Sequence, residues 1–399
     1  MKKFLLLVAL IVIAWLVYSY VLVPGRDKQK PPPPPIPGPV DNNPPSNPPT
    51  DGVMLFSQGK YKEAIKRLEQ EINDGKAEDQ GKYWYYIAVS HDKLEQSEKA
   101  LKVWEKIVKE YSSAEYCGDA YYEIGRRSKD KAQKIQYLET AQAKFPQSQG
   151  GRAAGVELGE YYLSDTSIQD REFKARHAFS MALRSNLPKE KADDIKNKLI
   201  EINKKLVFSP YPTPDSTMYA VVPGDTIAAI SKKYKVVAPG DLSLGHIRRV
   251  NGVKGTNIFP NDNLKILTGV FHIEINKVNH TLTLYMNNEY IKEYMIGVGS
   301  PEKSETPPGE FHIAGKVVHP PWTKRFEDGH QEQIPYGDPR NVLGTRWMGF
   351  KERPRLGIHG TTKPESIGQN VSDGCIRMHN AEVEELYDLV PEGTKIIIE

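Results

Sequence analysis

The sequence predicts a multidomain chain: a transmembrane helix, an all-α repeat array, a small βααβ module and a C-terminal, mainly-β domain. Three observations predict this order. An uncharged run of twenty residues lies near the start, a helical pattern then repeats itself, and strand-like alternation follows a proline-rich break. At 399 residues the chain is also too long for one compact core.

The charge balance argues against a nucleic-acid partner, and the positions of the cysteines argue against a disulfide. Lys and Arg number 54 against 51 Asp and Glu, a formal net charge of +3. So small an imbalance does not favour nucleic acid, and we expect no nucleic-acid partner. The two cysteines, Cys117 and Cys375, fall in segments that we predict to be different domains, so we expect both to be reduced. No motif predicts a cofactor or a metal.

Residues 1–24 are predicted to be a membrane anchor. The uncharged run from Phe4 to Val23 is long enough to cross a hydrocarbon core of about 30 Å as a helix. A cleaved signal peptide is the alternative, but the run is longer than a usual signal peptide core and no A-x-A-like site follows. The large domains would then lie outside the cytoplasm, on a single-pass protein of the cell membrane.

Residues 25–50 are rich in proline, "PPPPPIPGPVDNNPPSNPP". Proline lacks the amide donor and fixes φ, so this segment cannot form a helix or a central strand. We interpret it as a stiff linker. A proline-rich recognition ligand is the other interpretation.

Residues 51–206 are predicted to form a helical repeat array. "GKYKEAIKRLEQEI" is echoed by "EQSEKALKVWEKIV", which places Ala64 and Ala100 36 positions apart. This period is close to the roughly 34 residues of helix-pair repeats, and the segment resembles tetratricopeptide repeats. An irregular helical bundle is the alternative. We expect a scaffold, with envelope proteins as possible partners and no chemistry of its own.

Residues 217–268 follow the break "SPYPTPDST" and predict a βααβ module. They resemble a lysin motif (LysM), which implies binding of peptidoglycan glycans through loops beside the strands. The resemblance assigns glycan binding to Gly224, Asp225, Thr226 and Asn251. The segment departs from the pattern in a longer connection, "VVAPGDLSLGH". A module that only spaces the domains is the alternative.

Residues 269–399 predict a β domain with one short helix. Alternation runs through "VFHIEINKVNHTLTLYMNNEYIKEYMIGVG", as expected of strands joined by tight turns. Only residues 380–390 have a helical period, and Asn380 is placed to cap that helix.

Cys375 has three interpretations. It could be a buried structural cysteine, but Ser, Asp, Gly and Arg surround it in the sequence. It could bind zinc with His359 and His379, which would leave a four-ligand site incomplete. It could instead be a nucleophile, because a thiol with a pKa of about 8.5 needs a base such as His359 beside it. Gly374 would permit a tight turn that aims backbone amides at a developing oxyanion.

The stretch "GIHGTTKPESIGQNVSDGCIRMHN", residues 357–380, resembles the active-site signature of YkuD-type L,D-transpeptidases: His-Gly-Thr, a gap, then Ser-x-Gly-Cys-Ile-Arg-Met. "NVLGTRWMGFK" and "TPPGEF" are also similar to that family. The resemblance implies that Cys375 is the nucleophile and His359 its base. It implies that the backbone carbonyl of Ser372, or one in its neighbourhood, orients the imidazole, and that the Gly374 and Cys375 amides are candidates for an oxyanion hole. The substrate-binding residues it implies are Arg377, Gly360, Thr361 and Trp347.

One version of the family pattern has a second histidine where this chain has Asp373. A carboxylate so close is expected to raise the pKa of the thiol.

The resemblance implies acyl transfer on peptidoglycan stem peptides through a cysteine thioester, with 3→3 cross-linking as the product. Water as the acceptor would instead make the protein an L,D-carboxypeptidase that trims tetrapeptide stems. A non-enzymatic wall-binding scaffold is the third possibility.

Overall fold

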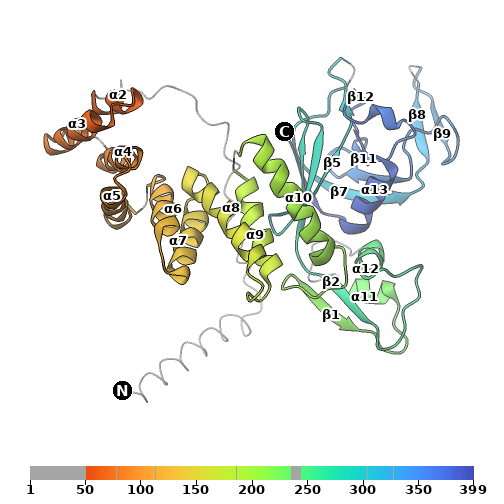
Figure 1. The fold of residues 1–399 in the computed structure, drawn as a ribbon. Coiled ribbons are helices and arrows are strands. Elements are labelled where there is room, and N and C mark those ends of the chain that lie inside the picture. The colour runs from red at the N-terminus through yellow and green to blue at the C-terminus, as the bar shows by residue number, and fades with distance from the viewer. Residues whose placement is uncertain are drawn as a thin grey trace, which may run out of the picture. The chain divides into compact units, whose positions relative to one another are not determined.

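The computed structural model describes residues 51–399 except 78, 113, 186, 235–243, 303 and 327 (Figure 1). The predicted anchor, residues 1–24, and the predicted linker, residues 25–50, lie outside the described residues and stay predictions. None of the described helices combines the length and the apolar character that a bilayer crossing requires.

The first part of the described chain is all-helical, as predicted. Consecutive helices pack against one another, and small residues allow the close approach: Ala64 and Ala100, the pair that sets the repeat period, are both fully buried. Their bounds are α2 Asp51–Ser57, α3 Tyr61–Asn73, α4 Gln80–Lys93, α5 Ser97–Glu110, α6 Cys117–Arg127, α7 Lys131–Lys144, α8 Gln149–Ser164, α9 Arg171–Leu183 and α10 Lys189–Leu206.

The βααβ module follows in the predicted order. Strand β1 (Ser216–Ala220) pairs antiparallel with β2 (Asn263–Leu267), and helices α11 (Ile227–Lys233) and α12 (Leu244–Asn251) lie between them in sequence. The module has its own small core, formed by Val221, Ile227, Ile230, Ile247, Leu264 and Ile266. Helix α12 also packs on the last helix of the chain, where Arg249 donates two hydrogen bonds to Asp388, at 3.0 and 2.7 Å.

The C-terminal part is built on an eight-stranded sheet of order β13-β11-β10-β7-β14-β3-β4-β5. The strands Phe271–Asn276 and Lys395–Ile398 alternate buried and partly exposed residues, as the sequence pattern predicts, whereas other strands of the sheet carry runs of buried residues. Their bounds are β3 Phe271–Asn276, β4 Thr281–Met286, β5 Glu289–Met295, β7 Gly309–Val318, β10 Arg346–Phe350, β11 Gly357–His359, β13 Ile376–Arg377 and β14 Lys395–Ile398.

Short strands and one α-helix complete this part. Two small sheets pair β6 (Val298–Gly299) with β12 (Asn370–Ser372) and β8 (Trp322–Arg325) with β9 (Gln331–Ile334). Helix α13 spans Asn380–Leu389, close to the prediction, but its N-cap is His379. The predicted capping role of Asn380 is therefore wrong, and its side chain instead forms hydrogen bonds with the backbone of Thr345 and Thr361.

The last helices of the array form a common core with the β domain, although the sequence predicted separate units. Helices α9 and α10 pack on β5, the outermost strand of the large sheet. One hydrophobic cluster runs from Phe179 and Leu199 of the helices to Tyr290 and Ile291 of β5. The Asn203 amide donates to the carbonyls of both strand residues, at 3.0 and 2.9 Å. Ser180 accepts the amide of Tyr290 at 3.0 Å.

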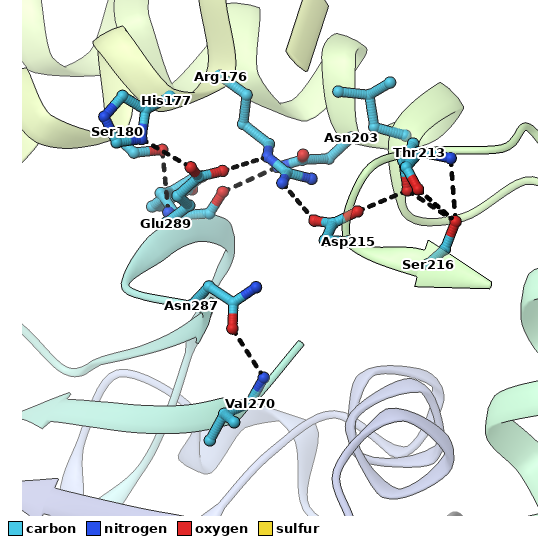
Figure 2. Close-up of polar contacts among 12 residues, drawn as sticks. Arg176, His177, Ser180, Asn203, Thr213, Asp215, Ser216, Val270, Asn287 and Glu289 are labelled. Carbon is cyan, nitrogen blue, oxygen red and sulfur yellow. Dashed lines mark hydrogen bonds and ion pairs between the residues drawn. The ribbon is translucent and has the colours of Figure 1, made fainter. Parts of the chain in front are cut away.

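A buried ionic junction links the three parts of the described chain (Figure 2). Arg176 of α9 is 1% exposed. Its Nε lies 2.6 Å from Glu289 in the β domain, and one terminal nitrogen lies 2.5 Å from Asp215, which precedes β1. His177 contacts the other oxygen of Glu289 at 2.8 Å. We name the group Arg176, Asp215 and Glu289 the ionic junction.

Candidate functional site

Cys375 and His359 lie on neighbouring segments of the large sheet. Cys375 follows β12 and directly precedes β13, which pairs in parallel with β11. In this register Ile376 faces Ile358 and Arg377 faces His359. The turn and strand pairing thus bring together residues that are sixteen positions apart in the sequence.

The Cys375 thiol is partly buried. Its Sγ lies 3.6 Å from the carbonyl oxygen of Arg355. Burial raises the pKa of Cys375 to about 11; a hydrogen bond from the Gly357 backbone and the charge of Arg377 oppose this rise, whereas Asp373 adds to it. The expected effect of Asp373 on the pKa of the thiol is therefore present, and it is smaller than that of burial.

His359 is 2% exposed, and its ring is held from two sides. Nδ1 lies 2.5 Å from the carbonyl oxygen of Gly360, and the indole of Trp347 stacks on the ring at a centroid distance of 5.9 Å. Burial, assisted by the charge of Arg377, lowers the pKa of His359 to about 4, while hydrogen bonds with the Gly360 and Leu343 backbone oppose the shift. The imidazole is neutral at pH 7 and can accept a proton.

The carbonyl that holds the imidazole belongs to Gly360, so the prediction for the Ser372 carbonyl is wrong. The Ser372 carbonyl instead accepts the amide of Ser300 at 3.0 Å. The Ser372 hydroxyl donates to the carbonyl oxygen of Cys375 at 2.5 Å. Ser372 therefore orients the backbone after the nucleophile and does not orient the base.

In this state the thiol and the imidazole each form a hydrogen bond with a backbone carbonyl, and among the hydrogen bonds of the described residues none joins the two side chains. With pKa values of about 11 and about 4, the pair is stable as neutral thiol and neutral imidazole. Hydrogen bonds of catalytic groups often tighten only when substrate is bound. Proton transfer from sulfur to nitrogen is therefore expected to accompany attack on a substrate.

Two backbone amides beside the thiol are available to donate hydrogen bonds to a substrate. Gly374 has φ +96°, a left-handed conformation that other residues adopt only with strain. Among the hydrogen bonds of the described chain, the amides of Gly374 and Cys375 donate to no protein group. Successive amides in a turn can form an anion-binding concavity, and an oxyanion hole built from these two amides stays a prediction.

The residues predicted to bind substrate have different environments. Arg377 follows the nucleophile, and its Nε is buried without a hydrogen-bond partner in the described chain. Thr361 is buried, and its hydroxyl accepts the Lys363 amide at 2.9 Å. This side chain therefore stabilises the conformation of its own loop. Trp347 packs on the imidazole. Their substrate contacts stay predictions.

Two further residues position the site, and the sequence interpretation did not assign them this role. Asn380 accepts the amides of Thr345 and Thr361 at 3.3 and 3.1 Å. Its amide donates to the Thr361 carbonyl at 2.9 Å. A Cβ on Gly360 would lie 2.2 Å from the side-chain oxygen of Asn380, which explains why a glycine follows His359. The other residue is Thr306, in the "TPPGEF" segment.

In the βααβ module, three of the side chains predicted to bind glycan form hydrogen bonds within the module. Asp225 accepts the Val222 amide and the Tyr219 hydroxyl, both at 2.9 Å. Thr226 caps α11 by accepting the Ala229 amide. Asn251 links α12 to β2 through hydrogen bonds with the Lys265 backbone. Gly224 has φ +90°. A glycan role for these four residues stays a prediction.

The zinc interpretation gains no support. Within the part of the chain that the structure describes, no three His, Cys, Asp or Glu side chains gather in a geometry that could hold a metal ion.

The raised pKa of the thiol predicts how Cys375 reacts with iodoacetamide. Because only the thiolate reacts, and the pKa is about 11, the alkylation rate of the free protein should rise about tenfold per pH unit between pH 7 and 9. The measurement follows the mass increase of the intact protein, with Cys375→Ala reporting any reaction at buried Cys117. A rate that is flat over this range would show that an ion pair with His359 already exists.

Comparison with known proteins identifies the parts of the chain. Residues 271–398 match the L,D-transpeptidase catalytic domain, residues 219–267 the LysM domain and residues 83–114 the tetratricopeptide repeat. The chain is 37% identical over 136 residues to the putative L,D-transpeptidase YqjB of Bacillus subtilis, covering 33% of this chain and 73% of that protein. It is 33% identical over 180 residues to the putative L,D-transpeptidase YkuD of the same organism, covering 45% of this chain and 97% of that protein.

Among solved structures, the catalytic domain of the Enterococcus faecium L,D-transpeptidase matches 32% of this chain and 96% of its own length, with 25% identity and a TM-score of 0.27. The match to YkuD covers almost the whole of that relative, and the residues that match the catalytic-domain family include Cys375 and His359. The chain belongs to the YkuD family of L,D-transpeptidases.

Proposed function

We propose that this enzyme transfers acyl groups between peptidoglycan stem peptides, and that Cys375 carries the acyl group as a thioester. The observation that carries the proposal is that three features occur together. The Cys375 thiol lies beside the strand that pairs with the strand of His359, the imidazole of His359 is buried and neutral, and the Gly374 and Cys375 amides donate no hydrogen bond within the described chain. A nucleophile, a base and an oxyanion hole are the parts that acyl transfer requires.

In the first half-reaction, Cys375 attacks the amide carbonyl that follows the L-centre of the third residue in a tetrapeptide stem. The thiol proton moves to His359 as the carbon–sulfur bond forms, and the amides of Gly374 and Cys375 stabilise the oxyanion. His359 then returns the proton to the leaving nitrogen, and the terminal D-alanine departs. The Gly360 carbonyl and Trp347 hold the imidazole in one orientation throughout.

In the second half-reaction an amine of another stem attacks the thioester carbonyl and gives its proton to His359. The carbon–sulfur bond breaks, the Cys375 sulfur leaves and takes the proton back from His359, and a 3→3 cross-link is formed. Water in the place of the amine would yield a tripeptide, which is the carboxypeptidase outcome. The LysM module supports a polymeric wall substrate, because a second binding site on the same polymer raises the local concentration of stems. The predicted anchor would hold the enzyme at the outer face of the cell membrane.

Incubation of the protein with purified disaccharide-tetrapeptide tests the proposal. We expect a product whose mass is that of two substrates minus one alanine. A tripeptide alone would establish the carboxypeptidase, and unchanged substrate would favour the wall-binding scaffold. Mass spectrometry distinguishes the three outcomes, and Cys375→Ala supplies the blank.

A further inference from the structure

Thr306 connects two segments on either side of the nucleophile turn. It lies between β6 and β7, is 0% exposed and is 68 positions from Gly374 in the sequence. Its hydroxyl oxygen accepts the amide of Gly299 at 2.8 Å. The hydroxyl proton is therefore free to be donated, and it goes to the carbonyl oxygen of Gly374 at 2.9 Å.

This hydrogen bond fixes the plane of the peptide that contains the Cys375 amide. No peptide bond of the described chain is cis, and in a trans peptide the carbonyl and the amide point in opposite directions. Because Thr306 holds the Gly374 carbonyl on one side, the Cys375 N–H points to the other side, away from Thr306. That N–H is one of the two amides that donate to no protein group.

The surroundings leave Thr306 little freedom to move. Lys277 donates to the Thr306 carbonyl at 2.9 Å, so the backbone is held as well as the side chain. A Cβ on Gly299 would lie 2.6 Å from the Thr306 amide nitrogen and 2.8 Å from the Gly374 Cα. The three residues are packed so closely that Gly299 can carry no side chain.

We infer that Thr306 is a positioning residue of the oxyanion hole, acting through the Gly374–Cys375 peptide. The inference rests on the acyl-transfer function proposed above. Thr306 does not touch the substrate. It keeps the Cys375 amide aimed at the place where the carbonyl oxygen gains charge, while Ser372 holds the next peptide by donating to the Cys375 carbonyl. The nucleophile thus lies between two peptides that are each held by a buried hydroxyl.

Thr306→Val removes the hydroxyl and keeps the shape, and Thr306→Ser keeps the hydroxyl. Two reagents separate the consequences. A carbapenem acylates a thiol through an oxyanion at its carbonyl, whereas iodoacetamide alkylates a thiol by displacement of iodide and forms no oxyanion. For Thr306→Val we expect acylation by the carbapenem and kcat on disaccharide-tetrapeptide to fall about 10- to 100-fold. KM and the alkylation rate should stay within about twofold, and Thr306→Ser should restore most of the lost rate.

The matched control is Thr394→Val. Thr394 is also buried, and its hydroxyl donates to the carbonyl oxygen of Pro391 at 2.7 Å and not to the nucleophile turn. If Thr306→Val fails to fold by circular dichroism, Thr306→Ala gives a second variant without the hydroxyl.

Three results would overturn the inference. Thr306→Val could be acylated as fast as the wild type, it could lose acylation and alkylation in equal proportion, or Thr394→Val could show the same selective loss. A wild-type protein that is neither acylated nor active would refute the proposed function itself, and this inference with it.

Discussion

Replacing Arg176 with methionine is expected to lower the free energy of unfolding of the part of the protein that contains the β domain by about 3–5 kcal/mol. The guanidinium contacts both Asp215 and Glu289 and is almost completely buried. Methionine fills much of the same space but leaves two buried carboxylates without the guanidinium that balances their charge. Removing one member of a buried ionic group costs more than the group contributes, because the remaining charges stay away from water. Urea unfolding followed by circular dichroism measures the change.

Arg126→Met is the matched control. Arg126 pairs with Glu123 on the surface of α6, and its side chain is 44% exposed, so its loss should change stability by about 0–1 kcal/mol. Adding Asp215→Asn and Glu289→Gln to Arg176→Met removes both stranded charges and should recover part of the stability. Equal effects of Arg176→Met and Arg126→Met would contradict a structural role for the ionic junction.

Cys375→Ala is expected to abolish acyl transfer, with a loss of at least about 10³-fold in kcat on disaccharide-tetrapeptide. The thiol that is proposed to form the thioester is removed, so the amides and the imidazole have no nucleophile to assist. Intact-protein mass spectrometry should show a carbapenem adduct on the wild type and none on this variant. Sedimentation with purified peptidoglycan should be nearly unchanged, because the LysM module is untouched.

Cys117→Ala is the control for the second thiol. Cys117 is buried in α6, and this variant should retain the adduct and the activity. An adduct on Cys375→Ala would place the nucleophile elsewhere. Loss of peptidoglycan binding together with acylation would indicate that Cys375 matters for folding.

Local patterns in the sequence predicted much of the fold. The helical period predicted the all-α part, and strand alternation predicted the β domain. The predicted βααβ order of the small module is also correct. Each of these follows from hydrophobic spacing over a short stretch of chain. The end of the last helix was also close, at Leu389 instead of residue 390.

Contacts between distant segments could not be predicted in this way. Arg176 and Glu289 are 113 positions apart, and nothing local pairs them, so the shared core of the array and the β domain was missed. Thr306 was visible in "TPPGEF" but could not be placed beside Gly374. The carbonyl on the imidazole was assigned to Ser372 instead of Gly360, because spacing does not reveal which way a loop carbonyl points.

The coverage of β5 by α9 and α10 has a consequence for any shortened form of the protein. An outer strand with open amides and carbonyls is a template on which other chains can add strands and aggregate. Here Ser180 and Asn203 occupy those groups at Tyr290 and Ile291. A fragment cut at the start of the family domain would lose this cover, so soluble catalytic fragments should begin before Arg171.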